Sequence, residues 1–383
     1  GGTKALENVQ HGNEKVLRAR LDDAKFFFEN DRKKTLEGHR DDLTRINYQE
    51  GMGDMRDKAD RLQKLTEAIG KDWGFTAEEA ADADRAAFLS KSDLATGMVT
   101  EFTELQGEMG KEYALLDGEK PEVAQAIFEQ YMPRFAGDIL PEQEIGRALS
   151  LADKLDNLAA TFLRGLIPTG SQDPFALRRQ TIGAVNILTD GKIHWDIRRG
   201  IEAALALLPG DEETKKTVLS QIEDFFRQRI KAIMLDEGIA YDIIDAVLAG
   251  PVDDIYALFL KARSMAESQL KDEADLRQAV TRLANITKGK TGGKVDPSLF
   301  TEDVEKKLQD AFDAVSAKAL PLFASYEYGK ALPALKELTA PINDYLDNVM
   351  VMVEDEAVKN NRISQLLATL ALFNTWGDFS KLV

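Results

Sequence analysis

Apolar residues along most of this chain recur every three or four positions, and short polar breakers separate the amphipathic stretches. No alternating strand pattern of convincing length is present, and the only extended candidate lies near residues 8–16. The sequence therefore predicts an all-α fold. Helices are expected at about 20–48 (two helices), 53–70, 77–90, 91–103, 120–130, 142–164 and 173–189, three times between 196 and 249, and then at 253–287, 301–326, 328–351 and 355–376.

Two local patterns give sharper expectations. In the first long stretch, Leu21, Phe28 and the neighbouring phenylalanines are predicted to face inward. Further on, Asp173 is predicted to cap a helix that has Pro174 at its first position. The adjacent cations Arg178 and Arg179 would then lie one turn into that helix.

The overall charge limits the classes of binding partner that are compatible with the sequence. The chain of 383 residues has a net charge of −17, so indiscriminate polyanion binding is disfavoured. Nucleic acid remains compatible where cations cluster, as they do at 178–179, 198–199, 215–216, 227–231 and 288–294. The alternative is that such clusters are solvated faces. The absence of cysteine excludes disulfides, thiolate catalysis and cysteine metal sites.

Ordered runs of residues suggest a relationship to a known family. They are GNEKVLRARLDDAKFFF at 12–28, KSDLATGMVTEF at 91–102 with LQGEMG at 105–110, QYMPRFAG at 130–137, ALSLADKLDNL at 148–158, PTGSQDPFALRR at 168–179, VMVMV at 349–353 and NR at 361–362. In this order, across residues 12–383, they resemble the β subunit of bacterial heterotetrameric glycyl-tRNA synthetase. Each run is weak alone, and together they are specific.

The resemblance implies a domain order. It comprises a lead-in segment at 1–50, a degenerate HD-like helical domain at 51–168, a helical middle region at 169–250 and a DALR-type anticodon-binding bundle at 251–383. Gly250-Pro251 supplies the break before the last domain. The resemblance also implies that the chain is the C-terminal part of a longer subunit, with Gly1-Gly2-Thr3 at a processing boundary.

The same resemblance implies a function. The chain would be the tRNA-binding β subunit, or a fragment of it, that supports glycylation by a catalytic α subunit in a cytoplasmic α2β2 assembly. No catalytic residue and no cofactor are expected in this chain, and ATP and Mg²⁺ are expected on the α subunit. The partners would be that subunit and glycine tRNA, with no membrane.

Six residues are the candidate tRNA contacts: Arg178, Arg179, Arg282, Asn285, Lys288 and Arg362. Arg282 and Asn285 share one helix face with Lys288 displaced towards its edge, beside a polar flexible loop at 288–294. Arginine and lysine suit phosphates, and asparagine can read a base edge. Alternatively, Arg282 and Arg362 are structural and pair with carboxylates of the same bundle.

A metal-dependent HD-type phosphohydrolase is the sharpest enzymatic alternative. Asp153 resembles the last metal ligand of that superfamily, but the regions where its histidines would fall contain Lys58 and Lys91. A charged lysine cannot ligate a cation and repels it. We therefore expect no metal here. A helical scaffold that binds only protein is the other alternative.

Overall fold

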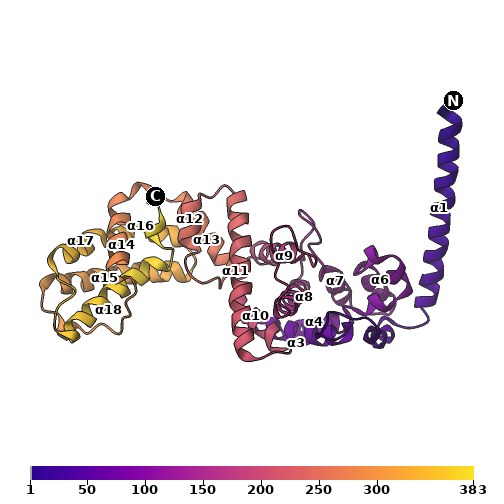
Figure 1. The fold of residues 1–383 in the computed structure, drawn as a ribbon, viewed down its shortest axis with the longest axis horizontal. Helices are drawn as coiled ribbons and strands as arrows, with labels where there is room; N and C mark the ends of the chain where they lie inside the picture. Colours follow the sequence, from indigo (N-terminus) through magenta and orange to yellow (C-terminus); the bar gives the residue numbers. More distant parts are fainter. Residues whose placement is uncertain (1) are drawn as a thin grey trace. The chain divides into compact units, whose positions relative to one another are not determined.

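Eighteen α-helices and several short 3-10 turns build residues 2–383, the part of the chain that the computed structural model describes (Figure 1). Within that range β pairing is limited to two isolated bridges, Asn47 with Asp54 and Thr169 with Gln172. The all-α prediction is confirmed. Contacts divide the chain into two units, one ending at Phe225 and one spanning Phe226–Val383. This division falls inside helix α11 (Glu212–Asp236).

The first unit is built around one buried helix, α8. The helices before α11 are α1 (Gly2–Asp31), α2 (Leu36–His39), α3 (Met55–Trp73), α4 (Ala77–Leu89), α5 (Gly97–Glu101), α6 (Glu108–Leu116), α7 (Pro121–Glu129), α8 (Glu144–Leu163), α9 (Leu177–Asp190) and α10 (Ile197–Ala206). Helix α8 packs against α3, α4, α7, α9 and α10. Apolar residues on nearly all its sides, including Leu149, Leu151 and Leu158, are buried, as expected for a central helix.

The second unit is a bundle in which α14 and α15 both pack against the last helices. Its helices after α11 are α12 (Tyr241–Val247), α13 (Ile255–Glu267), α14 (Ala274–Thr287), α15 (Asp303–Ala324), α16 (Leu332–Lys336), α17 (Thr339–Asn348) and α18 (Glu356–Asn374). Helices α14 and α15 each contact α17 and α18. The buried Trp376 indole donates to the Lys261 carbonyl at 3.1 Å, which secures the chain end after α18.

Helix α1 corrects two expectations. It runs unbroken through residues 8–16, so the extended segment predicted there is wrong. Leu21 and Phe26 are 61% and 63% exposed, so the prediction that this apolar stripe faces inward is also wrong. Packing is found in the second half of the helix, where the Arg20 guanidinium lies 4.9 Å from the centroid of the Phe102 ring and the Phe28 and Tyr113 ring centroids are 5.9 Å apart. The periodicity gave the helix correctly, but it does not reveal whether a partner covers the stripe.

Two other helices begin or break differently from the pattern. The stretch at 91–103 is a 3-10 turn followed by α5, whose N-cap Thr96 accepts from the Val99 amide. Helix α9 begins at Leu177 rather than after Asp173, because Ala176 takes a left-handed conformation (φ 54°). The Asp173 carboxylate still accepts from the Leu177 and Arg178 amides, at 2.8 and 3.0 Å. It therefore caps the helix from outside its first turn.

Asp31 anchors the end of α1 to the rest of the first unit. Its buried carboxylate accepts from the amides of Gly97 and Met98, at 2.8 and 3.0 Å, and from the Tyr113 hydroxyl at 2.8 Å. These bonds satisfy the N-terminus of α5 and link it to α6. A single side chain thus joins three helices.

We expect Asp31→Ala to lower the free energy of unfolding by at least about 2 kcal/mol, because two buried donors and one partly buried donor lose a charged acceptor. Asp23→Ala on the exposed part of the same helix is the matched control and should change it by less than about 0.5 kcal/mol. Urea denaturation followed by circular dichroism measures both. Equal effects of the two substitutions would contradict the anchoring role.

Candidate functional site

A pocket of about 360 Å³ opens in the first unit beside α8. Four buried charged side chains form its floor: Lys58 of α3, Lys91 just after α4, and Asp153 and Lys154 of α8. The rings of Tyr48 and Tyr131 form part of its walls, and the exposed residues Gln106, Arg134 and Arg179 stand at its rim. The pocket thus combines a charged floor with an accessible opening.

Two ammonium groups converge on Asp153. The Lys91 and Lys58 nitrogens lie 2.9 and 3.3 Å from one oxygen of its carboxylate. Burial opposes ionisation, but Lys91 and Lys58 outweigh it and hold the pKa of Asp153 well below its usual range. The structure therefore brings together Lys58, Lys91 and Asp153, the three positions that correspond to metal ligands in the HD superfamily. Ammonium charge occupies the space around this carboxylate.

A second carboxylate, Asp156, lies one turn further along α8 and completes the network. It accepts from Lys58 at 2.7 Å and from the Arg61 guanidinium at 2.7 and 3.1 Å. The side-chain amide oxygen of Asn157 accepts from Lys58 at 2.8 Å and from the Tyr48 hydroxyl at 2.7 Å. Lys58 is thereby held between α3 and α8.

Lys154 is buried without a carboxylate at its nitrogen. It donates to the Met132 carbonyl at 3.0 Å and to the Ser150 hydroxyl at 2.6 Å, both of which are neutral acceptors. Burial lowers the pKa of Lys154 to about 8, with Asp153 opposing and Lys91 adding to that shift. Burial also lowers the pKa of Lys91, and the neighbouring Lys58 charge adds to it. The floor is thus rich in positive charge.

The rim adds two arginines with different partners. Arg134 forms a fork with Asp138, at 2.8 and 3.1 Å. Arg179 makes one weak contact, from its guanidinium to the Arg134 carbonyl at 3.4 Å. Within residues 2–383 no carboxylate lies within ion-pairing distance of Arg179. Arg178, its neighbour on α9, is half-buried and does not line this pocket.

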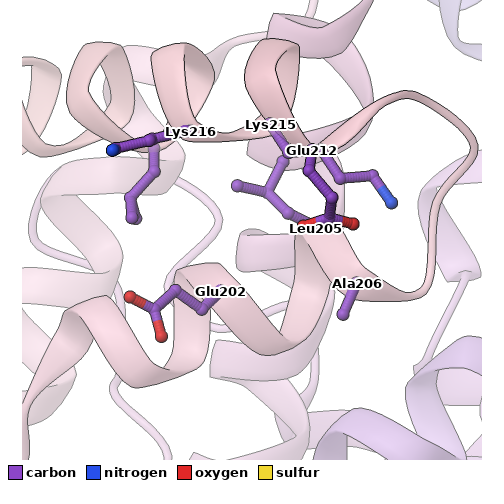
Figure 2. Close-up of a pocket in the computed structure, with 7 residues that line it drawn as sticks. Glu202, Leu205, Ala206, Glu212, Lys215 and Lys216 are labelled. Atoms are coloured by element: carbon purple, nitrogen blue, oxygen red, sulfur yellow. The ribbon is translucent and has the colours of Figure 1, made fainter.

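A second cleft, of about 410 Å³, lies between α10 and the start of α11 (Figure 2). Glu202 comes from α10, and Glu212, Lys215 and Lys216 come from α11. Two carboxylates and two ammonium groups give this cleft no net charge. Its remaining lining, which includes Leu205, is apolar, and the set offers neither a nucleophile with a base nor a surplus of one charge.

In the second unit, the predicted contacts on α14 have different surroundings. Arg282 donates to Asp347 at 2.7 Å and to Asn343 at 2.9 Å, both on α17, and keeps about a third of its side chain exposed. Asn285 and Lys288 are exposed. Helix α14 ends at Thr287, so Lys288 lies beyond the helix face that the spacing suggested.

Arg362 is a structural residue of this bundle. It is 4% exposed, and its guanidinium contacts Glu305 at 2.9 Å, the Met350 carbonyl at 2.6 Å and the Thr301 hydroxyl at 2.8 Å. All three partners lie within the bundle. Arg362 therefore pairs with a carboxylate of the same bundle, as in the structural alternative. It is not part of the proposed RNA-facing surface.

Of the six predicted residues, two lie on α9 in the first unit and four lie in the second unit. Sequence reasoning also missed Lys154, Tyr131 and Asp156. The spacing of Asp153 and Asp156, three apart on one helix face, was the available signal for a paired acidic cluster. Nothing in the sequence marked Lys154 as buried.

Residues 2–383 contain no cluster of three or more histidine, cysteine, aspartate or glutamate side chains suited to hold a metal. Their helices include none that is long and apolar enough to cross a bilayer. Neither a metal cage nor a transmembrane helix is therefore part of the described structure.

The helices of the second unit define the class to which the chain belongs. Residues 276–377, from α14 to the end of α18, match the family model of the DALR anticodon binding domain. Residues 1–249 match the family model of the glycyl-tRNA synthetase beta subunit. The chain belongs to the glycyl-tRNA synthetase beta subunit family.

Individual relatives agree along the whole chain. Two proteins named glycine–tRNA ligase beta subunit, from Clostridioides difficile and Desulforamulus reducens, are 44% and 42% identical over 384 and 387 aligned residues. Each alignment covers 100% of this chain and 56% of the relative. A third, from Halothermothrix orenii, is 42% identical over 94% of this chain and 53% of its own length. The chain thus spans little more than half the length of these curated relatives.

We expect protein purified without chelator to carry no stoichiometric manganese, iron, zinc or nickel, because Lys58 and Lys91 repel a cation at Asp153. Elemental analysis measures this directly. Asp153→Ala is the comparison variant and should leave the metal content unchanged. One equivalent of metal that disappears in Asp153→Ala would refute this interpretation of the pocket.

Lys154 generates a second prediction, on pH. Its folded pKa of about 8 lies below its ordinary value of 10.5, so the unfolded chain binds more protons between these two values. The free energy of unfolding should therefore rise with pH from 8 to 10.5, by up to about 3 kcal/mol relative to Lys154→Met. Urea titrations of both proteins at several pH values measure the difference. A constant difference would show that Lys154 has an ordinary pKa.

Proposed function

We propose that this chain is a tRNA-binding part of the beta subunit of a glycyl-tRNA synthetase. The observation that carries the proposal is the anticodon-domain match over residues 276–377 in a chain that belongs to this family. In the proposed assembly, a separate α subunit binds ATP and Mg²⁺ and activates glycine, with an α2β2 stoichiometry in the cytoplasm. This chain contributes tRNA binding and no catalytic residue.

The proposed RNA-facing surface is the end of α14 with the loop that follows it. Asn285 and Lys288 are exposed there, and the loop at 288–296 adds Lys290 and Lys294. Lysine side chains provide phosphate contacts of low sequence specificity, whereas Asn285 offers an amide that can pair with a base edge. The surface thus combines affinity and discrimination within a few residues.

Helix α18 holds this loop in place. Asn361 accepts from the Asp296 amide at 2.7 Å and donates to the Asp296 carbonyl at 3.0 Å. The Ser364 hydroxyl accepts from the Gly293 amide at 2.8 Å. Gly292 packs closely on this helix, since a Cβ atom there would lie 2.9 Å from a methyl carbon of Leu367 and 3.2 Å from the Ser364 Cα atom. The expectation of a flexible loop is therefore replaced by a segment bonded to α18.

Arg282 has a mixed role in this proposal. Its bonds to Asp347 and Asn343 link α14 to α17, and the exposed part of the guanidinium remains available to a phosphate. A half-exposed pair of this kind contributes at most about 1 kcal/mol to folding. Arg178 and Arg179 on α9 are proposed as further contacts in the first unit. No observation favours the metal-dependent phosphohydrolase or the protein-only scaffold.

We expect Lys288→Ala to weaken binding of glycine tRNA in the presence of the α subunit, by about 1 kcal/mol or more, and to reduce the salt dependence of binding. Asn285→Ala should reduce the difference in affinity between glycine tRNA and an anticodon-swapped tRNA. Filter binding or fluorescence titration at several salt concentrations measures both effects.

The matched control is Lys306→Ala, an exposed lysine on α15 of the same unit, which should bind both tRNAs like the unmodified chain. Circular dichroism melting establishes that each variant is folded. If Lys288→Ala and Asn285→Ala are folded and retain full affinity and discrimination, this surface does not contact the anticodon.

A further inference from the structure

The pocket on α8 contains more positive charge than its carboxylates balance. Five cationic side chains line it, from Lys58, Lys91, Lys154, Arg134 and Arg179, and Asp153 is the one carboxylate among the lining residues. Asp156 lies behind and is shared by Lys58 and Arg61. Asp138 binds Arg134. Lys154 and Arg179 are left with neutral acceptors alone.

A surplus of buried charge is costly unless a counter-charge completes it. The ion pairs of Lys58 with Asp156 and of Lys91 with Asp153 are sufficient to crosslink the helices internally. Lys154 adds a third buried ammonium group one residue from Asp153, on the floor of an open cavity. Arg179 adds a guanidinium at the mouth. Both of these charges suit an anion that enters from solvent.

The other lining groups suit a ligand larger than an inorganic anion. A volume of about 360 Å³ falls in the range of sites for small organic ligands. The Tyr48 and Tyr131 rings offer apolar walls, and Gln106, Asn157 and Gln180 offer amide groups. The Asn157 amide donates to Gln180 at 2.8 Å, which fixes both at the wall.

We propose that this pocket binds a phosphorylated ligand of nucleotide size, with its phosphate directed to Lys91, Lys154 and Arg179. The floor supplies charge to the phosphate, and the tyrosine rings and amides meet the nucleoside. A free nucleotide and the phosphorylated end of an RNA share this chemistry. The inference concerns the first unit and stands independently of the anticodon surface proposed in the second.

The test is calorimetric titration of the 383-residue chain with 5′-AMP, adenosine and inorganic phosphate. We expect 5′-AMP to bind at least about tenfold more tightly than adenosine, since a charge-assisted contact to phosphate is worth a factor of this size. Arg179→Ala, a rim substitution that removes no buried ion pair, should weaken binding of 5′-AMP about tenfold. Arg45→Ala, an exposed arginine elsewhere in the first unit, is the matched control and should bind like the unmodified chain.

Lys154→Met tests the floor with a side chain of similar shape, and the Met132 carbonyl keeps its bond from the Ser150 hydroxyl at 2.8 Å. This substitution should weaken the binding of 5′-AMP and leave the binding of adenosine unchanged. Equal binding of 5′-AMP and adenosine, the absence of binding by both 5′-AMP and inorganic phosphate, or full affinity in Arg179→Ala would each overturn the proposal.

Competition assigns the source of the phosphate. A tRNA with a 5′-phosphate that displaces 5′-AMP, when the phosphatase-treated tRNA does not, supports an RNA end as the ligand. If 5′-AMP stays bound in the presence of either tRNA, the result supports a free nucleotide as the ligand. Neither result depends on whether Asn285 and Lys288 contact an anticodon, so failure of one proposal leaves the other intact.

Discussion

The ion network along one face of α8 is the interaction on which the first unit depends. Asp153 and Asp156 lie one turn apart on a helix that is buried on almost every side. Lys58 and Arg61 reach them from α3, and Lys91 reaches Asp153 from the segment after α4. A charge in such a place is tolerated only when its partners are fixed around it. The register of these two elements against α8 is therefore set by charge as well as by apolar packing.

The second unit uses the same principle with different partners. Glu305 is buried near the start of α15 and accepts from Arg362 of α18 and from the Thr301 and Glu302 amides. Arg362 in turn donates to the Met350 carbonyl. One buried pair thus joins the start of α15, the segment after α17 and α18. Arg362, which the sequence predicted to contact tRNA, is thus a member of the core.

Periodicity and capping residues predicted α3, α4, α7, α8, α15 and α18 well, because each has a strong apolar pattern and lies between clear breakers. The same reasoning failed where tertiary partners decide the outcome. The stripe on α1 is regular but lacks a covering surface around Leu21, and the role of Arg362 depends on Glu305, which is 57 residues away in the chain. For the pocket, the resemblance identified Lys58, Lys91 and Asp153. The burial of Lys154 required the fold.

The attachment of the 288–296 loop to α18 has a consequence for how any ligand meets it. Asn361 and Ser364 restrict the loop backbone during folding, so its conformational entropy is lost before an encounter rather than during it. A ligand then meets a preorganised surface, and ordering of the loop costs it less binding free energy. Substitutions in α18 that never touch a ligand would consequently alter its residence time by loosening the loop. Control over recognition therefore extends to a helix that lies behind the surface.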